Sequence, residues 1–481
     1  MSTEYEPVIG LEIHVQLKTR TKMFCSCELS FGEDPNTRTC PVCLGLPGTL
    51  PVVNARAIHY GLLMGLALDC EIAPRSIFHR KNYFYPDLPK GYQISQYDIP
   101  LASTGLLDVP GGPSVRIHRA HLEEDAAKLI HHGESGRIHG ADASIVDFNR
   151  GGTPLIEIVS EPDLRSAAQA REWLQLLRST LRSLGVSDVN MEEGSLRADA
   201  NVSVRPAGSD ALGTKTELKN MNSFRFLERG IDAELRRQRE LIATGAEVVQ
   251  ETMHFDPQSG TLTPLRSKEE AQDYRYFPEP DLPPLEVTEA MIERARADLP
   301  ELPADRQRRY EETFGLAADT ARVLAFREGL GPWFEEALAA GDDLDPQLLA
   351  NWTTGDLARV LAGAEPADSK VKPHALSALV GMVARKEVAP SAAKTVLERL
   401  AAEGGEPAAI VEAEGLGAME DTGELDGAID SALAANPDIA ERLRSGDMKP
   451  MGVIIGHVMR ETKGRADGGE VTRLVRSKLG L

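Results

Sequence analysis

The chain has 481 residues, of which 42% are hydrophobic, and its formal net charge at pH 7 is -21. A chain of this length exceeds what one hydrophobic core usually organises, so two or three domains are expected. The acidic surplus excludes attraction to nucleic acid over the whole surface, and any RNA contact must be local. No apolar run is long enough to span a bilayer and no basic and apolar leader opens the sequence, which predicts a cytoplasmic protein without a membrane partner.

The first predicted element is a strand at residues 8–17, VIGLEIHVQL. Its apolar residues alternate with polar ones, so that Glu12 and His14 stand side by side on one face while the other face is buried. A carboxylate beside an imidazole suits a hard cation or the phosphate bound to it. On periodicity alone, a solvated sheet face explains the two residues equally well.

Four of the five cysteines follow this strand, at Cys25, Cys27, Cys40 and Cys43. Two knuckles, Cys-x-Cys and Cys-x-x-Cys, separated by twelve residues, match the spacing of a four-thiolate structural zinc site. The alternative is a set of four reduced cysteines partly buried near the core.

Carboxylates gather in two further segments. Residues 118–132, HRAHLEEDAAKLIHH, are interpreted as a helix with His121, Glu124 and Lys128 along one face and Glu123 and Asp125 beside them. An ordinary surface helix has the same appearance. In TPLIEIVSEPDL, Glu157 lies within an apolar run, where a charge needs a cation or a hydrogen-bonded partner.

Residues 190–206, NMEEGSLRADANVSVRP, predict a strand whose polar face carries Arg197, Asp199 and Asn201. An arginine near carboxylates on a rigid strand can hold phosphate oxygens while the carboxylates hold a bridging metal ion. RKNYFYPDLPKGYQISQ adds Lys81, and TELKNMNSFRF adds Lys219. Together these segments indicate an active site that binds a divalent metal for chemistry on a phosphate.

The segments up to residue 284 read as short strands and turns, and a proline-rich stretch then precedes Ala, Leu, Arg and Glu at helical spacing. This pattern predicts a catalytic domain at 1–295, an all-α helical domain at 296–405 and a small all-α C-terminal domain at 406–481. The last domain carries a basic face that we expect to contact nucleic acid, and an ordinary solvated helix face is the alternative. Its candidate residues are Lys449, Arg460, Lys463 and Arg465.

Eight of these motifs resemble, in order, the B subunit of the aspartyl/glutamyl-tRNA amidotransferases, the GatB family. They are VIGLEIHVQL, PGTLPVVN, RKNYFYPDLPKGYQISQ, HLEEDAAK, DFNRGGTPLIEIVSEPDL, MEEGSLRADANVSVRP, ELKNMNSF and DYRYFPEPDLPP, and the tail motif KPMGVIIGHVMRETKGRA continues the series. The helical middle resembles the family mainly in layout. The resemblance implies an α+β fold: a glutamine-synthetase-like catalytic domain with a mixed or antiparallel sheet, then an all-α domain and an all-α tail that touches tRNA.

The resemblance also implies an ATP-dependent carbon–nitrogen ligase that uses glutamine as amido donor. ATP and Mg2+ would phosphorylate the side-chain carboxylate of Glu-tRNA(Gln) or Asp-tRNA(Asn), and ammonia would then displace the phosphate to give Gln-tRNA(Gln) or Asn-tRNA(Asn). The ammonia would come through an internal channel from a glutaminase A subunit, and a small C subunit would complete a heterotrimer. The cognate non-discriminating aminoacyl-tRNA synthetase is a further candidate partner.

The family's roles can be carried onto this sequence residue by residue. Catalytic roles fall to Glu12, His14, Glu124, Glu157 and Asp199, Mg2+ ligation to Glu12, His14, Glu123, Glu124 and Glu157, and ATP contacts to Lys81, Arg197, Asn201 and Lys219. Two other classes stay open: a zinc-stabilised RNA-binding scaffold whose carboxylates are only solvated faces, and a stand-alone ligase that joins free ammonia to a small carboxylic acid. The sequence does not separate the Glu-tRNA substrate from the Asp-tRNA substrate.

Overall fold

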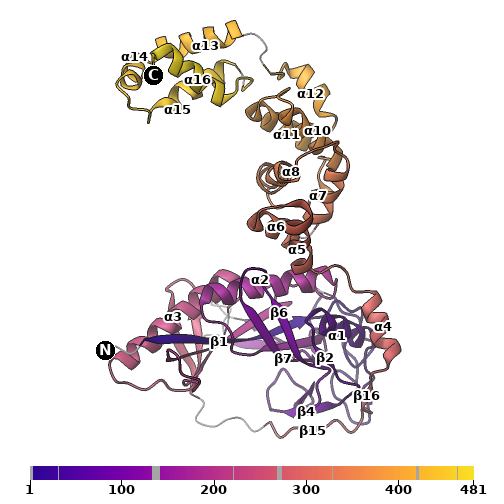
Figure 1. Ribbon diagram of the computed structural model, residues 1–481. Helices are drawn as coiled ribbons and strands as arrows, with labels where there is room; N and C mark the ends of the chain where they lie inside the picture. Colours follow the sequence, from indigo (N-terminus) through magenta and orange to yellow (C-terminus); the bar gives the residue numbers. More distant parts are fainter. Residues whose placement is uncertain are drawn as a thin grey trace. The chain divides into compact units, whose positions relative to one another are not determined.

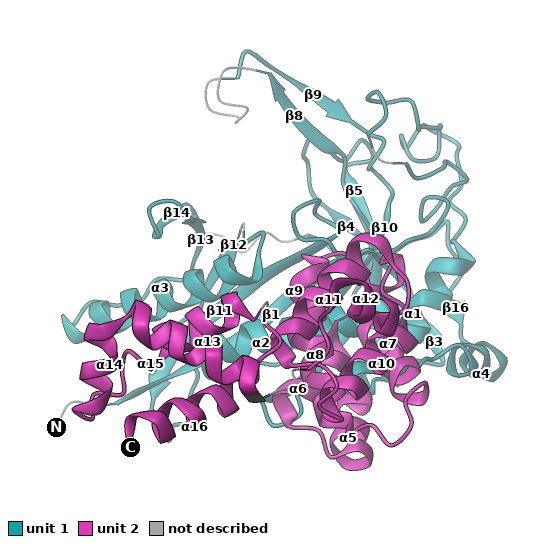
Figure 2. Cartoon of the chain, turned by 90° about the horizontal axis from the view of Figure 1, so that it is seen from above, with its two compact units in different colours: residues 1–304 teal, residues 305–481 magenta. Residues whose placement is uncertain are grey.

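The computed structural model describes residues 4–30, 32–132, 141–219, 221–267, 274–327, 329–418, 422–462 and 464–481. The chain divides into two compact units, residues 1–304 and 305–481, which Figure 2 colours separately. The first unit contains strands and helices and the second is built from helices in its described part, which confirms the α+β class followed by helical modules. The three predicted domain limits, and the likeness to glutamine synthetase, stay predictions.

A mixed sheet of nine strands organises the first unit, in the order β14-β13-β12-β11-β1-β10-β7-β6-β2. All neighbours are antiparallel except β12 and β13, which are parallel. The strands are β1 (Tyr5–Gln16), β2 (Glu71–Ile72), β6 (Ala102–Asp108), β7 (Ser114–Glu124), β10 (Pro154–Ser160), β11 (Leu196–Pro206), β12 (Thr216–Lys219), β13 (Glu251–Asp256) and β14 (Thr261–Ser267).

One face of this sheet forms the core. On β1 the side chains of Ile9, Leu11, Ile13 and Val15 are almost completely buried, as the alternation predicts. Three helices pack on the sheet, α1 (Ala55–Ala67), α2 (Ala167–Ser183) and α3 (Phe224–Ala243), and Figure 1 shows α2 and α3 lying along it. Each begins at an Asn or Ser side chain that accepts hydrogen bonds from the first-turn amides. The opposite face of the sheet is therefore left for polar residues.

The predicted helix at 118–132 is wrong, because this segment forms the end of β7 and, after a break at 125–127, the strand β8 (Lys128–His132). The buried apolar residues of β7 are Val115 and Ile117, then Ala120 and Leu122. A β-bulge lies between these two pairs, where the register with β10 shifts. The bulge shifts the alternation by one residue, and the break at 125–127 gives His121, Glu124 and Lys128 the spacing of three and four that a helix face would have.

Short sheets lie beside the main one. β5 (Tyr92–Gln96) contacts β7 and pairs with β4 (Phe78–Asn82), which carries Lys81. β4 also pairs with β15 (Phe277–Pro278), while β16 (Leu285–Glu286) pairs with β3 (Arg75–Ser76) and β8 with β9 (Ala143–Asp147). The helix α4 (Glu289–Ala297) completes the unit. These additions bring loops and lysines against the polar side of β7.

The described part of the second unit is helical and contains two hydrophobic clusters, one from Tyr310 to Leu416 and one from Leu425 to Val475. Several of its helices begin at a proline, which suits the first turn because it needs no amide hydrogen there. In the residues that the structure describes, no helix is long and apolar enough to cross a membrane. The helices are α5 (Pro303–Phe314), α6 (Ala318–Phe326), α7 (Leu330–Ala339), α8 (Pro346–Trp352), α9 (Ala358–Leu361), α10 (Pro373–Ala384), α11 (Pro390–Glu403), α12 (Pro407–Glu414), α13 (Thr422–Ala435), α14 (Pro437–Arg444), α15 (Met451–Glu461) and α16 (Gly468–Leu479).

Candidate active site

The register of four neighbouring strands brings the polar residues of the sequence together on the open face of the sheet. β1 lies between β10 and β11, and His14 is the Cα partner of Glu157 on one side and of Arg197 on the other. Glu157 is in turn opposite His121 of β7. Glu12 is opposite Asp199. Residues separated by more than a hundred positions in sequence therefore form one row across four strands.

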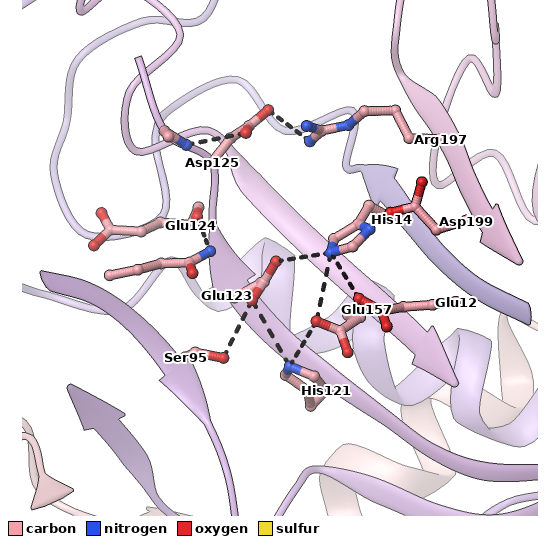
Figure 3. A network of polar contacts seen from close by, with 12 residues as sticks. Glu12, His14, Ser95, His121, Glu123, Glu124, Asp125, Glu157, Arg197 and Asp199 are labelled. Atoms are coloured by element: carbon pink, nitrogen blue, oxygen red, sulfur yellow. Dashed lines mark hydrogen bonds and ion pairs between the residues drawn. The ribbon is translucent and has the colours of Figure 1, made fainter. Parts of the chain in front are cut away.

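Two groups of possible metal ligands share Glu157, as Figure 3 shows. In the first, His14 Nε2 lies 3.4 Å from Glu157 Oε2 and 3.9 Å from Glu12 Oε1. In the second, His121 Nε2 lies 3.6 Å from Glu157 Oε2 and 3.8 Å from Glu123 Oε2. The ligand atoms within each group lie within 4.8 Å of one another, which is close enough for one cation to be held by each group.

The charges of these groups depend on one another. Burial alone would lower the pKa of His14, but its hydrogen bond with Glu157 and the charge of Glu123 raise that pKa to about 9. Burial would raise the pKa of Glu157, yet the charge of His121 and the hydrogen bond from His14 hold it well below its usual range. Burial, with the charge of Glu157, raises the pKa of Glu12. The carboxylates thus require nearby positive charge, which a divalent cation can supply.

The donor set fits a hard divalent ion. Glu12, Glu123 and Glu157 offer carboxylate oxygens, the ligands that Mg2+ and Mn2+ prefer, and the imidazoles are also acceptable to Mn2+. His121 is almost fully buried and its Nδ1 has no hydrogen-bond partner among the described residues, so the ring is held mainly by its contacts with Glu123 and Glu157. Ser95 Oγ, 3.2 Å away, donates to Glu123 Oε2 and steadies that ligand.

Cations surround the two ligand groups. The pKa of Lys81, which burial alone would lower, is raised by the charge of Glu123, and its Nζ lies 5.0 Å from the ring centre of Tyr274. On the other side, Lys219 Nζ lies 2.9 Å from Asp199 Oδ2, and the pKa of this lysine is raised by Asp199 despite its burial. Positive charges at both edges of a carboxylate cluster can bind the oxygens of a polyphosphate.

The structure places most predicted site residues together and one apart. Asn201 follows Asp199 on the same face of β11, at the strand pair with Gly10. Glu124 instead accepts hydrogen bonds from Lys90 and from the amide of Ile94, 3.0 Å away. It belongs to neither ligand group and lines a separate cavity of about 200 Å³. Its position next to Glu123 in a strand explains this, because adjacent side chains point in different directions.

Two residues of the site, His121 and Asp125, have no predicted site role, although both belong to the segment interpreted as a helix. His121 was considered only as part of a helix face, although Arg119, His121 and Glu123 alternate as the face of a strand should. Asp125 accepts hydrogen bonds at one oxygen from Gln16 Nε2 and from Arg197 Nη2, both at 2.9 Å. No local pattern connects Asp125 with a residue 72 positions away, so only the folded chain reveals this contact.

The four cysteines of the two knuckles form a compact thiol cluster at the edge of the same unit. Their Sγ atoms lie within 4.8 Å of one another. Tetrahedral zinc with bonds of about 2.3 Å separates its sulfur ligands by about 3.8 Å, so the cluster fits zinc. A hydrogen bond from Cys25 lowers the pKa of Cys43 to about 4, whereas burial raises the pKa of Cys27 to about 11.

The basic residues predicted to contact nucleic acid lie in the second unit. Lys449 and Arg460 are exposed, while the Arg465 guanidinium lies 3.1 Å from Glu424. Arg460 Nε donates to the carbonyl of Gly456 at 3.1 Å. The fourth residue, Lys463, lies outside the described residues. The acidic partner of Arg465 reduces the net positive charge of this face, and its contact with RNA stays a prediction.

Comparison with known proteins identifies the family. The model of the GatB/GatE catalytic domain matches residues 7–293, and that of the GatB domain matches residues 332–479. The B subunit of the aspartyl/glutamyl-tRNA(Asn/Gln) amidotransferase of Anaeromyxobacter sp. (strain Fw109-5) is 50% identical over 485 residues, covering 99% of both chains. The proteins of the same name from Carboxydothermus hydrogenoformans and Moorella thermoacetica are 47% and 49% identical over 481 residues, each covering 99% of this chain. The polar row across β11, β1, β10 and β7 therefore lies in the catalytic domain of a member of the GatB family, the B subunits of tRNA-dependent amidotransferases.

Proposed function

We propose that this chain activates the side-chain carboxylate of Glu-tRNA(Gln) or Asp-tRNA(Asn) with ATP and then directs ammonia onto the activated carbon. The observation that carries the proposal is the pair of ligand groups sharing Glu157, with Lys81 on one side and Lys219 on the other. Such a site can hold the metal and the phosphates of a nucleotide.

The chemistry requires this arrangement. A carboxylate resists attack by ammonia until one of its oxygens becomes a good leaving group, and transfer of the γ-phosphoryl group from ATP to that oxygen releases ADP and gives an acyl phosphate. Ammonia then attacks the acyl carbon, and inorganic phosphate leaves with the electrons of the broken carbon–oxygen bond. Bound Mg2+ would neutralise charge on the phosphoryl oxygens during transfer.

Each residue has a proposed task. Glu12, His14 and Glu157 hold one ion, and His121, Glu123 and Glu157 form the second ligand group. The phosphate contacts are assigned to Lys81, Arg197, Asn201 and Lys219, with Asp199 fixing the ammonium of Lys219. Glu124 acts as a ligand only if its side chain turns away from Lys90 when a cation binds.

The remaining assignments extend from the site to the assembly. The relatives are named as the B member of an amidotransferase, and we propose a glutaminase A subunit, an ammonia channel and a small C subunit as the rest of a cytoplasmic heterotrimer. We assign structural zinc to the thiol cluster. Lys449, Arg460, Lys463 and Arg465 are the proposed tRNA contacts, and the cognate non-discriminating synthetase is a further proposed partner.

A test uses the assembled complex with ATP, Mg2+ and each mischarged tRNA separately. Formation of ADP should depend on Glu-tRNA(Gln) or Asp-tRNA(Asn), and hydroxylamine in place of ammonia should trap the acyl phosphate as a hydroxamate on the tRNA. ADP formation with free glutamate or aspartate alone would favour the stand-alone ligase. RNA binding without any ATP turnover would favour the scaffold, and either result would overturn the proposal.

A further inference from the structure

Lys22 is a fully buried lysine beside the thiol cluster. Its side chain is among the largest in the described chain with essentially no exposed surface. The ammonium Nζ donates to the carbonyl of Phe148 at 2.9 Å and lies 3.6 Å from Cys43 Sγ. Within the described residues, no ion pair joins this Nζ to a carboxylate, and the only acidic group in contact with it is the Cys43 thiol.

A buried ammonium without an opposite charge is strongly unfavourable. A zinc ion with four thiolates has the complementary problem, since two negative charges remain in excess after the metal is neutralised. We propose that Lys22 is the counter-ion of a four-thiolate zinc site and a positioning residue for its ligand Cys43. This inference rests on the zinc assignment made for the thiol cluster.

The surroundings of Cys43 support a thiolate there. Its sulfur also accepts a hydrogen bond from the amide of Cys40 at 3.2 Å, and such donors stabilise a negatively charged sulfur. Lys22 is fixed by its own backbone, because its amide donates to the carbonyl of Cys27 at 3.0 Å. The backbone of Lys22 is thus bonded to the first knuckle, while its ammonium contacts Cys43 of the second knuckle.

Lys22 also connects the thiol cluster with the catalytic sheet. The carbonyl that it holds, Phe148, precedes the turn that leads into β10. In this turn Arg150 donates to the carbonyls of Ala126 and Ala127, both at 2.9 Å. The amide of Met23 donates to the carbonyl of Gly152 at 2.7 Å. Loss of the ammonium thus removes a link between the zinc knuckles and the loop that positions the strand of Glu157.

The experiment measures zinc binding by the full-length chain at one fixed pH. Zinc content after purification is determined by atomic absorption, and affinity by competition with a chromogenic chelator. Lys22→Met should weaken zinc affinity at least tenfold, the effect of losing one charge-assisted hydrogen bond, while Lys22→Arg should stay closer to the wild type. The matched control is Lys18→Met, since Lys18 is exposed and pairs with Asp188. Unchanged affinity in Lys22→Met would overturn the proposal.

A second pair of variants tests the same contact if Lys22→Met does not fold. Cys43→Ala and Cys27→Ala each remove one sulfur ligand, but only Cys43→Ala deprives Lys22 of its sulfur partner. Cys43→Ala should therefore unfold at a lower urea concentration than Cys27→Ala, and equal midpoints would contradict a counter-ion role. A wild-type chain that binds neither zinc nor cobalt would instead remove the zinc assignment itself, which leaves the phosphoryl-transfer proposal untouched.

Discussion

Replacement of Glu157 by glutamine tests the shared ligand most directly. Its Oε2 lies 3.4 Å from His14 Nε2 and 3.6 Å from His121 Nε2, so one substitution removes the single negative charge that the two ligand groups share. Removal of one member of a buried charged pair costs about 3–5 kcal/mol. If about 4 kcal/mol of this is lost from the transition state, transamidation slows roughly a thousandfold.

The assay follows amide formation on mischarged tRNA in the reconstituted complex across a series of Mg2+ concentrations. The partner's hydrolysis of glutamine is measured in the same samples, because the ammonia source does not depend on this carboxylate. Glu161→Gln is the matched control, since Glu161 follows the same strand and pairs with the exposed His118 at 2.9 Å. Transamidation by Glu157→Gln within tenfold of the wild type would refute the shared-ligand reasoning, provided that thermal unfolding shows both variants folded.

Three further predictions concern other parts of the chain. Gly105→Ala should lower the free energy of unfolding of the first unit in urea by about 1–3 kcal/mol, since a Cβ there would lie 2.6 Å from the carbonyl oxygen of Leu68. A decrease below about 0.5 kcal/mol would contradict this close contact. Burial and the charge of Asp69 raise the pKa of Cys70 to about 12. Iodoacetamide at pH 8 should therefore label Cys70 at least a hundredfold more slowly than a solvent-exposed thiol, as measured by mass spectrometry. Equal labelling rates would contradict this. Lys449→Ala with Arg460→Ala should weaken tRNA binding for all sequences and reduce its salt slope by about two without changing the KM for ATP, and an unchanged slope would exclude both residues from the interface.

The C-terminal helices share one hydrophobic cluster, so point variants test the tRNA contact better than a truncation. Ile454 and Val458 of α15 and Val471 and Val475 of α16 are completely buried in the second hydrophobic cluster. A chain that ends after residue 447 would lose these side chains and expose the rest of the cluster. Loss of tRNA binding in such a truncation would report unfolding rather than a lost contact.

The two faces of β1 could be predicted from its sequence, because a strand buried on one face has an apolar residue at every second position. Glu12 and His14 were placed correctly on the open face for this reason. On β7 the alternation is interrupted by the bulge after Ile117 and ends at the break at 125–127, and the spacing of His121, Glu124 and Lys128 across that break matches a helix face. His121 therefore received no site role, although Arg119, His121 and Glu123 alternate along one strand face.

Contacts made at the ends of strands could not be predicted in the same way. Glu123 and Glu124 are equivalent in the sequence, and only the packing of β5 against β7 gives Ser95 to the first and Lys90 to the second. The pairing of Asp125 with Arg197 likewise depends on a turn that no periodicity describes. The sequence therefore predicts the polar face of a strand reliably. It does not predict which of two adjacent carboxylates at the end of the strand is a metal ligand.

The central position of β1 has a consequence for how this protein can change in evolution. The strand exchanges hydrogen bonds with β10 on one edge and β11 on the other, so its register is fixed from both sides. One inserted or deleted residue in Val8–Gln16 would turn Glu12 and His14 into the core and expose Ile13. Substitutions can be sampled one at a time along this strand, but a change of its length removes the site in a single step.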